Sequence, residues 1–240
     1  MDNQKKIIFI SGTGRSGTHL VGRSISSHPE ITARIEESDT FALITRIATT
    51  QDIDLVLKTY LLKILLKLRL TKIFNNASNH VLEKSHPSLW LVDFLVKTFS
   101  ASKFIFVYRD LEPTVNSMLE HQGVMTWYNR LPQNRKNRFL GVNKSNVDEF
   151  EKYSIEEKCA LRWKSHYDEI FRLKKKYPQK VLVLKYDHFL TNPNQILKEV
   201  SDFLKISNSF TIETFKIESL DKWKNKLSPN QLDRIRKIVK

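Results

Sequence analysis

Residues 7–20, IIFISGTGRSGTHL, decide the fold because they join an apolar strand to a glycine-rich loop and then to a helix. The first four residues, 7–10, are all apolar and do not alternate with polar ones, as in a strand covered on both faces. Three of the six glycines of the chain follow within six residues, at Gly12, Gly14 and Gly17. Glycines let several backbone N–H groups point to one place, and the following helix adds the positive end of its dipole. The stretch therefore predicts an anion-binding loop at the end of a buried strand.

The rest of the chain repeats this alternation of strand and helix. Apolar, partly β-branched runs at 81–83, 103–108 and 181–186 predict three further buried strands. Apolar residues recur at three- and four-residue spacing between them, and Ser228 before a proline predicts the start of a last helix. We therefore expect a three-layer α/β fold, a central parallel sheet flanked by helices, in one domain over residues 1–240.

Length and composition indicate a globular protein and exclude an intramolecular disulfide. A chain of 240 residues with 40% hydrophobic and 28% charged residues is typical of a globular domain with a sizeable core. The apolar run at 7–10 is too short for a signal peptide or a membrane span, so neither an export signal nor an anchor is expected. The single cysteine, Cys159, excludes an intramolecular disulfide and suggests a reducing compartment. The expected absence of an anchor favours a cytoplasmic protein.

The charge balance is strongly basic. Lys and Arg number 40 against 26 Asp and Glu, a net charge of +14, which favours anionic partners. Residues 53–70 are rich in leucine and carry four basic residues, so they fit a membrane-surface helix or a packed helix with a solvated basic side. We favour the packed helix. Residues 129–144 carry five basic residues around Pro132 and predict a long basic loop.

The glycine loop differs from two common nucleotide-binding loops. Gly12 and Gly17 have the spacing of the G-x-x-x-x-G-K-[ST] phosphate loop, but Thr18 and His19 follow. The lysine that would contact β- and γ-phosphates is missing, which disfavours a nucleotide triphosphatase or kinase. The glycines also fit the dinucleotide pattern G-x-G-x-x-G, yet we expect no acidic residue at the end of the next strand, where that fold needs one.

Two segments resemble the sulfotransferases that use 3′-phosphoadenosine 5′-phosphosulfate (PAPS). Residues 11–20, SGTGRSGTHL, resemble the family's 5′-phosphosulfate loop, with His19 in place of its usual threonine. Residues 103–118, KFIFVYRDLEPTVNSM, resemble its 3′-phosphate element, a strand that ends in Arg109 with Ser117 on the next helix. A guanidinium can donate two parallel hydrogen bonds to a phosphate, and a serine can add a third.

The resemblance extends to two later segments. Residues 181–203, VLVLKYDHFLTNPNQILKEVSDF, are similar to the family's late strand and the helix after it, where Tyr186 contacts the donor or packs as an aromatic. Residues 220–232, LDKWKNKLSPNQL, resemble the carboxyl-terminal loop that folds over the nucleotide. The donor contacts that the resemblance implies are Gly14, Arg15, Ser16, Gly17, Thr18, His19, Arg109, Ser117, Tyr186, Lys222 and Trp223.

Sulfuryl transfer needs a base for the acceptor and positive charge beside the leaving phosphate oxygen. Residues 81–87, VLEKSHP, resemble a Glu-Lys-Thr-Pro element of the family, which implies that Lys84 stabilises that oxygen. Glu36 and Glu37 resemble the paired glutamates of protein-tyrosine sulfotransferases, which favours Glu37 as the base, with Glu36 in reserve. The alternative base is His86, since Lys84 and His86 have the Lys-x-His spacing of cytosolic small-molecule sulfotransferases.

The resemblance implies a P-loop-like sulfotransferase architecture and an enzyme that moves a sulfuryl group from PAPS to a hydroxyl or amine, leaving adenosine 3′,5′-bisphosphate. No metal is expected to be needed. Residues 40–79 and 122–146 are expected to form variable walls around the acceptor. The basic residues from Arg130 to Arg138 are typical of a site for an anionic glycan, lipid head group or acidic peptide, or they attract the anionic donor. The alternatives are a nucleotide or polynucleotide kinase and a basic module that binds nucleic acid or a membrane surface, although no nucleic-acid partner is expected.

Overall fold

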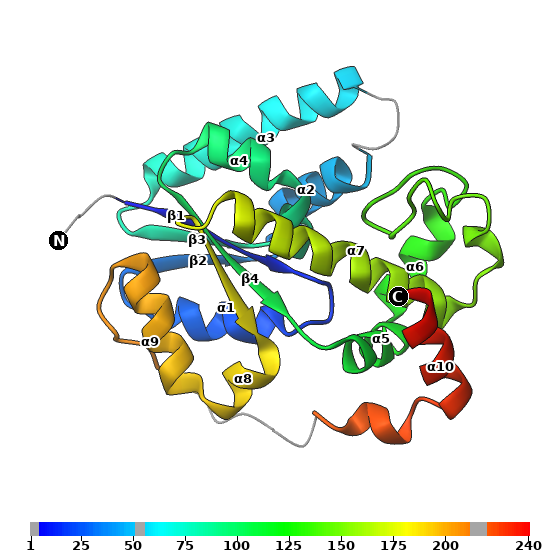
Figure 1. The fold of residues 1–240 in the computed structure, drawn as a ribbon. Coiled ribbons are helices and arrows are strands. Elements are labelled where there is room, and N and C mark those ends of the chain that lie inside the picture. Colours follow the sequence, from blue (N-terminus) through cyan, green and yellow to red (C-terminus); the bar gives the residue numbers. More distant parts are fainter. Residues whose placement is uncertain (1–4, 51–55, 212–219) are drawn as a thin grey trace.

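The computed structural model describes residues 5–50, 56–211 and 220–240. Within these ranges the chain forms a five-stranded parallel sheet in the order β2-β3-β1-β4-β5, with helices on both faces (Figure 1). The strands are β1 (Ile7–Gly12), β2 (Ile31–Ile35), β3 (His80–Lys84), β4 (Ser102–Tyr108) and β5 (Val181–Lys185). The α-helices are α1 (Thr18–Ser26), α2 (Ser38–Thr50), α3 (Val56–Asn76), α4 (Val92–Thr98), α5 (Leu111–Leu119), α6 (Gln122–Arg130), α7 (Ile155–Lys176), α8 (Tyr186–Thr191), α9 (Pro193–Leu204) and α10 (Pro229–Ile238). Short 3-10 helices are η1 (His86–Leu91), η2 (Phe150–Lys152) and η4 (Lys222–Asn225).

Two apolar clusters hold the sheet, one on each face. Successive side chains of a strand point to opposite faces, so Ile7 and Phe9 of β1 join one cluster, and Ile8 and Ile10 join the other. Helices α2, α3, α4 and α7 cover the first face, and α1, α8 and α9 cover the second (Figure 1). All six residues of β1 are buried, which explains the unbroken apolar run at 7–10. The predicted three-layer α/β fold is confirmed.

Strand β2 is an edge strand that the sequence analysis did not predict. It pairs only with β3, and of its five residues only Ile31 is buried, so its sequence ITARI lacks the apolar run of the other strands. The strand ends directly before Glu36. The expectation that no acidic residue follows the second strand was therefore wrong, because the strand itself was missed.

The order of the strands brings three predicted site segments together. Strand β1 lies between β3 and β4, so the chain moves from β1 to one side of the sheet and later to the other. Such a reversal leaves a crevice at the carboxyl ends of the strands. The glycine loop follows β1, Lys84 ends β3 and Arg109 follows β4, so all three meet at this edge.

Helix α3 is packed, but its solvent side differs from the prediction. Thr59, Leu66 and Leu70 are buried, as a packed helix requires. Its lysines do reach solvent, yet seven large apolar residues are exposed beside them, which the sequence analysis did not expect. Residues 53–55 lie outside the described residues. In the described ranges, no helix combines the length and the hydrophobicity needed to cross a membrane.

Two smaller predictions about the carboxyl half are confirmed. Ser228 caps α10, where its hydroxyl accepts a hydrogen bond from the Gln231 backbone N–H. The basic segment 129–144 leaves α6 after Arg130 and continues as an irregular loop, with one isolated bridge between Asn137 and Val142.

Candidate functional site

The loop between β1 and α1 has a shape that glycine alone suits at two positions. Gly12 has φ 152°, and a Cβ there would lie 2.0 Å from the carbonyl oxygen of Val107. Gly17 has φ 84°, and a Cβ there would lie 2.0 Å from the ring of Tyr186. The loop therefore approaches both β4 and α8 too closely for any side chain.

Ser16 stabilises this loop from within. It is buried, and its hydroxyl lies 2.7 Å from the carbonyl oxygen of Thr13 and 2.8 Å from that of Val107. The family resemblance implied that Ser16 contacts the donor. Its hydroxyl instead joins the loop to β4, and its backbone N–H donates to the Thr13 carbonyl oxygen at 3.1 Å, so both groups stabilise the loop itself.

A cavity of about 290 Å³ lies against the outer side of the loop. Three arginines contribute to its wall, and among the described residues that line it none is acidic. Seven of the eleven predicted donor contacts line it, and the full lining is Arg15, Gly17, Thr18, His19, Leu20, Arg23, Arg109, Ser117 and Tyr186. The structure thus brings residues from four distant segments to one positively charged cavity, here called the donor cavity.

Contacts across the donor cavity connect these segments. The Arg15 Nε donates a hydrogen bond to the Ser117 Oγ at 3.2 Å, which joins the loop to α5. The Arg109 guanidinium lies over the Tyr186 ring, 5.1 Å from its centre. The Arg109 Nε is 3.5 Å from Asp187 Oδ1, so β4 and α8 are held by an ion pair. The arginine that the resemblance assigns to a phosphate is thus held in place by two neighbours on α8.

A smaller cavity of about 90 Å³ lies on the other side of the loop. It shares three residues with the donor cavity, so the two cavities adjoin at the loop. Its lining is Gly14, Arg15, Thr18, His19, Glu36, Lys84, His86, His121, Val124 and Trp127. We call it the catalytic cavity, because the predicted Lys84 and His86 both line it.

Glu36 is the centre of the catalytic cavity. Its Oε1 accepts hydrogen bonds from Lys84 Nζ at 2.5 Å and from His86 Nδ1 at 3.2 Å. Its Oε2 lies 3.0 Å from His19 Nε2. Burial alone would raise the pKa of Glu36, but hydrogen bonds from His19, His86 and Lys84 outweigh it and hold the pKa far below its usual range. The carboxylate is therefore ionised and holds three nitrogen groups in place.

Glu37, the favoured base of the sequence analysis, lies outside both cavities. Its side chain is 53% exposed, against 22% for Glu36, and its Oε2 is 3.9 Å from the Arg34 guanidinium. Glu36 has φ 51°, a left-handed backbone conformation, which turns the two neighbouring side chains in different directions. The sequence shows two adjacent glutamates, and the backbone turn that separates them carries no clear sequence signal.

His86 is buried in the wall of the catalytic cavity. Its ring packs between Phe41 and Trp127, with ring centres 5.6 Å and 5.5 Å away. Burial lowers its pKa to about 4, so the imidazole is neutral near pH 7. Because Glu36 is ionised, Nδ1 carries the proton, and Nε2 is left as an acceptor without a hydrogen-bond partner among the described residues.

Lys84 is fully buried at the end of β3. Burial lowers its pKa, and the ion pair with Glu36 partly restores it. Lys84 therefore lies at the carboxyl edge of the sheet, as expected for the last residue of a parallel strand. Its partner Glu36 lies on the neighbouring strand connection, which explains how a lysine is accommodated without contact with solvent.

Arg162 on α7 is a residue that the sequence analysis missed. It is fully buried, with its guanidinium 4.5 Å from the Trp127 ring centre and 4.6 Å from that of Phe139. Its Nη2 would lie 3.2 Å from a Cβ on Gly14, directly behind the catalytic cavity. An arginine within a basic, amphipathic helix gives no signal that it points inward.

Three predicted donor contacts line neither cavity: Ser16, whose hydroxyl holds the loop, and the neighbours Lys222 and Trp223. Lys222 and Trp223 lie in η4, where Lys222 is exposed and Trp223 packs against the core cluster on the α2 side of the sheet. Residues 212–219, which lead to this segment, lie outside the described residues. The contact of Lys222 and Trp223 with a donor stays a prediction.

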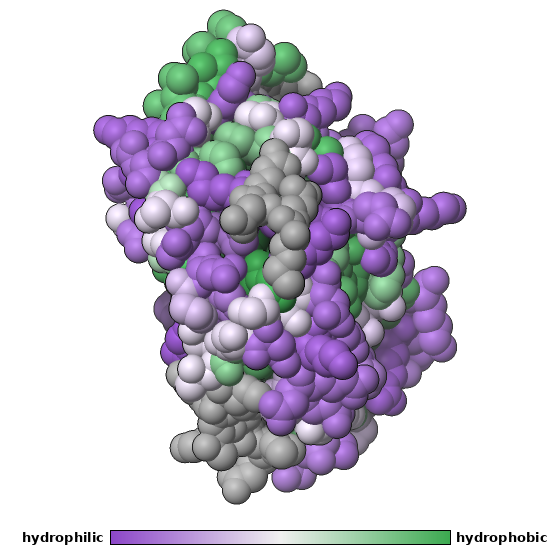
Figure 2. Space-filling model, turned by 90° about the vertical axis from the view of Figure 1, so that its left-hand side faces the viewer, coloured by the Kyte–Doolittle hydropathy of each residue, from purple (hydrophilic) through white to green (hydrophobic). Residues whose placement is uncertain are grey.

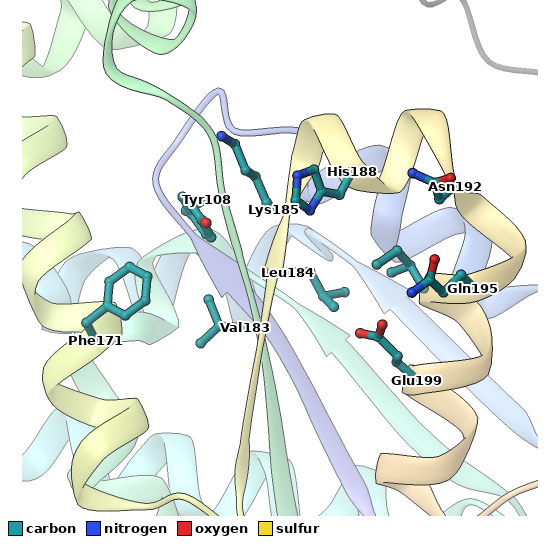
Figure 3. Close-up of a pocket in the computed structure, with 10 residues that line it drawn as sticks. Tyr108, Phe171, Val183, Leu184, Lys185, His188, Asn192, Gln195 and Glu199 are labelled. Atoms are coloured by element: carbon teal, nitrogen blue, oxygen red, sulfur yellow. The ribbon is translucent and has the colours of Figure 1, made fainter.

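A larger cavity, about 500 Å³, lies away from the predicted residues. Figure 3 shows it at the open edge of β5, between Phe171 of α7 and the side chains of Gln195 and Glu199 on α9. Lys185 and His188 border it as well. None of the predicted site residues lines it, so cavity size does not mark the candidate site in this protein.

The comparisons with known proteins agree with the geometry. The model of the sulfotransferase family matches residues 8–210. Protein-tyrosine sulfotransferase 1 of Danio rerio is 22% identical over 218 residues, 83% of this chain, and the chain spans about half the length (53%) of this curated relative.

Solved structures share the fold at low sequence identity. The sulfotransferase domain of the Synechococcus PCC 7002 olefin synthase has a TM-score of 0.60 at 13% identity, covering 100% of this chain and 97% of that one. A mouse sulfotransferase, SULT7A1, solved in complex with PAP, has a TM-score of 0.54 at 16% identity, covering 99% and 84%.

Proposed function

The chain belongs to the sulfotransferase family, and we propose that it transfers a sulfuryl group from PAPS to a hydroxyl or amine of an acceptor. One observation carries the proposal: the glycine loop separates an arginine-lined cavity from a cavity that holds Lys84, Glu36 and His86. A donor can therefore bind on one side of the loop while the acceptor reaches its sulfuryl group from the other side. The family match favours neither the kinase nor the basic binding module.

The donor cavity suits an anion with phosphates at two positions. Arg109 and Ser117 would bind the 3′-phosphate, and the backbone N–H groups of the loop at Gly14, Gly17 and Thr18 would bind the 5′-phosphosulfate. Gly17 supports this assignment, because its left-handed backbone, with φ 84°, curls the loop as a set of N–H groups that converge on an anion requires. Tyr186 adds an aromatic face against which an adenine could stack.

Lys84 and His86 would then share the chemistry. When bound, PAPS supplies the activated sulfuryl group, and the sulfur–oxygen bond to its phosphate breaks as the acceptor oxygen attacks. Lys84 Nζ provides positive charge for the phosphate oxygen that leaves. His86 Nε2 accepts the proton of the acceptor hydroxyl, and Glu36 holds the imidazole in the tautomer that leaves this nitrogen free to do so.

The geometry supports His86 over either glutamate as the base. The Glu36 carboxylate already accepts three hydrogen bonds, which lower its basicity. The exposed position of Glu37, outside both cavities, does not support the role that the sequence favoured. Trp127 and Val124, from the segment expected to form an acceptor wall, line the catalytic cavity and would contact the acceptor.

The direct test is transfer of labelled sulfate. The protein is incubated with PAPS labelled in its sulfuryl group and, separately, with a phenol, an acidic tyrosine peptide and an anionic glycan. We expect label to move to at least one acceptor class as the bisphosphate is released, and we expect Lys84→Met to bind the bisphosphate normally but to transfer little label. If the wild-type protein binds PAPS yet moves no label to any class, including water, the proposed reaction is wrong.

A further inference from the structure

Helix α3 exposes an unusual apolar surface. Of the nine large apolar side chains that are exposed in the described part of the chain, seven lie on this one helix. They are Val56, Leu57, Tyr60, Leu61, Ile64, Leu65 and Leu68, and Val56 is 83% exposed. Figure 2 shows the hydrophobic atoms gathered at the top of the molecule, the end at which α3 lies in Figure 1.

The exposed residues form a stripe along one side of the helix. Leu57, Leu61, Ile64, Leu65 and Leu68 recur at three- and four-residue spacing, so their side chains lie above one another over about 16 Å. The opposite side of the helix, with its buried residues, packs on the protein. The helix is therefore apolar on both sides, although only one of them is covered. Exposed stripes of this kind mark binding surfaces.

The charges beside the stripe point to the nature of the partner. Lys58 and Lys67 are exposed on its two flanks, and Lys72 is exposed at the end of the helix. The sequence Val56–Asn76 contains no acidic residue. A second copy docked on the same stripe by two-fold symmetry would oppose these lysines to one another, which disfavours self-association. A partner with a negatively charged surface and an apolar interior beneath it would match both the lysines and the apolar stripe.

We propose that α3 docks this protein on an anionic lipid bilayer. The stripe enters the region between headgroups and acyl chains, and Lys58, Lys67 and Lys72 contact lipid phosphates. A helix that lies in the plane of the membrane surface needs an exposed apolar side, which α3 has. It does not need to span the bilayer. The proposal is independent of sulfuryl transfer, because no residue of α3 lines the donor or the catalytic cavity.

The test is flotation of the full chain with vesicles of phosphatidylcholine alone and with vesicles that also contain phosphatidylglycerol. We expect the wild-type protein to bind the anionic vesicles more tightly by on the order of a hundredfold, as three lysines near the surface imply. The variant L61Q/L65Q/L68Q should lose binding to both, and K58Q/K67Q/K72Q should lose the preference for phosphatidylglycerol. All six altered positions are exposed, so both triple variants should keep the fold, which circular dichroism checks.

The matched control is Phe171→Gln, which removes an exposed apolar residue of α7 outside the stripe and should float like the wild-type protein. The proposal is overturned if the wild-type protein does not float with anionic vesicles, or if L61Q/L65Q/L68Q floats equally well. It is also overturned if the protein is a dimer in solution that this triple variant converts to a monomer, because the stripe would then be a contact between copies.

Discussion

A single carboxylate, Glu36, organises the residues that we assign to catalysis. It accepts hydrogen bonds from Lys84 and His86 on one oxygen and lies within hydrogen-bond distance of His19 on the other. Its neighbour Glu37 differs only by one position in the chain but faces solvent. The left-handed backbone at Glu36 decides which of the two glutamates enters the site. Replacing each glutamate in turn therefore shows which one contributes to catalysis.

His86→Asn and Glu36→Gln should each lower turnover by about 10² to 10⁴-fold, the usual contribution of a general base. The first removes the proton acceptor, and the second removes the charge that fixes its tautomer. Glu37→Gln is the matched control and should retain nearly full turnover. Single-turnover transfer from labelled PAPS measures all three. Loss of turnover in Glu37→Gln, with His86→Asn still active, would restore the base that the sequence favoured.

Glu83 makes stability depend on pH. It is fully buried beside Lys84 on β3, and burial raises its pKa from 4.5 to about 7, against a lowering by the Ser85 hydroxyl and Arg34. The folded state therefore binds more protons than the unfolded state between these two values, so this contribution to the free energy of unfolding falls as pH rises through that window.

Glu83→Gln removes this dependence. Relative to the wild-type protein, the free energy of unfolding of the variant should rise by at most about 3 kcal/mol as the pH is raised from 4.5 to above 7. Urea unfolding across this window measures the difference. A difference that stays constant with pH would show that Glu83 has an ordinary pKa in the folded protein.

Among the elements, the loop between β1 and α1 is the one whose backbone shape matters most. Gly17 lies at the start of α1 against the ring of Tyr186 on α8, so the loop, the helix and the far edge of the sheet are fitted to one another. The donor cavity has its shape because of this contact.

Gly17→Ala should destabilise the protein by about 2 to 4 kcal/mol, since alanine is strained at positive φ and its Cβ would overlap the Tyr186 ring. The double variant Gly17→Ala/Tyr186→Ala removes the overlap but keeps the backbone strain. It should therefore lose less stability than the sum of the losses in the two single variants. Thermal unfolding of the four proteins measures this coupling. Simple additivity would mean that the ring moves aside at little cost.

Elements differ in how far the sequence predicts them, and the reason is burial. Strand β1 and its loop are predictable because a doubly covered strand is apolar throughout and the loop needs glycine. Edge strand β2 has one buried residue and leaves no pattern. Within the site, Lys84 is expected from its position at a strand end, and His86 and Arg109 are expected from the family resemblance. The inward turn of Glu36 and the buried Arg162 depend on tertiary packing that local sequence does not encode.

The whole molecule has a net charge of +14, and its basic residues form part of two separate surfaces. Arginines concentrate in the donor cavity at the carboxyl edge of the sheet, and lysines flank the exposed stripe of α3. The first would attract an anionic nucleotide and the second an anionic surface. Salt should weaken both, but only the first depends on Arg109.

Calorimetric titration with adenosine 3′,5′-bisphosphate, without metal, tests the central claim most directly, with ATP and magnesium as the comparison. The wild-type protein should bind the bisphosphate with micromolar affinity and ATP only weakly. Arg109→Ala should lower the affinity by about 10- to 100-fold, because a phosphate loses its charged hydrogen-bond donor. Binding of magnesium ATP in preference to the bisphosphate, or equal affinity in Arg109→Ala, would contradict the assignment of this cavity to a PAPS-type donor.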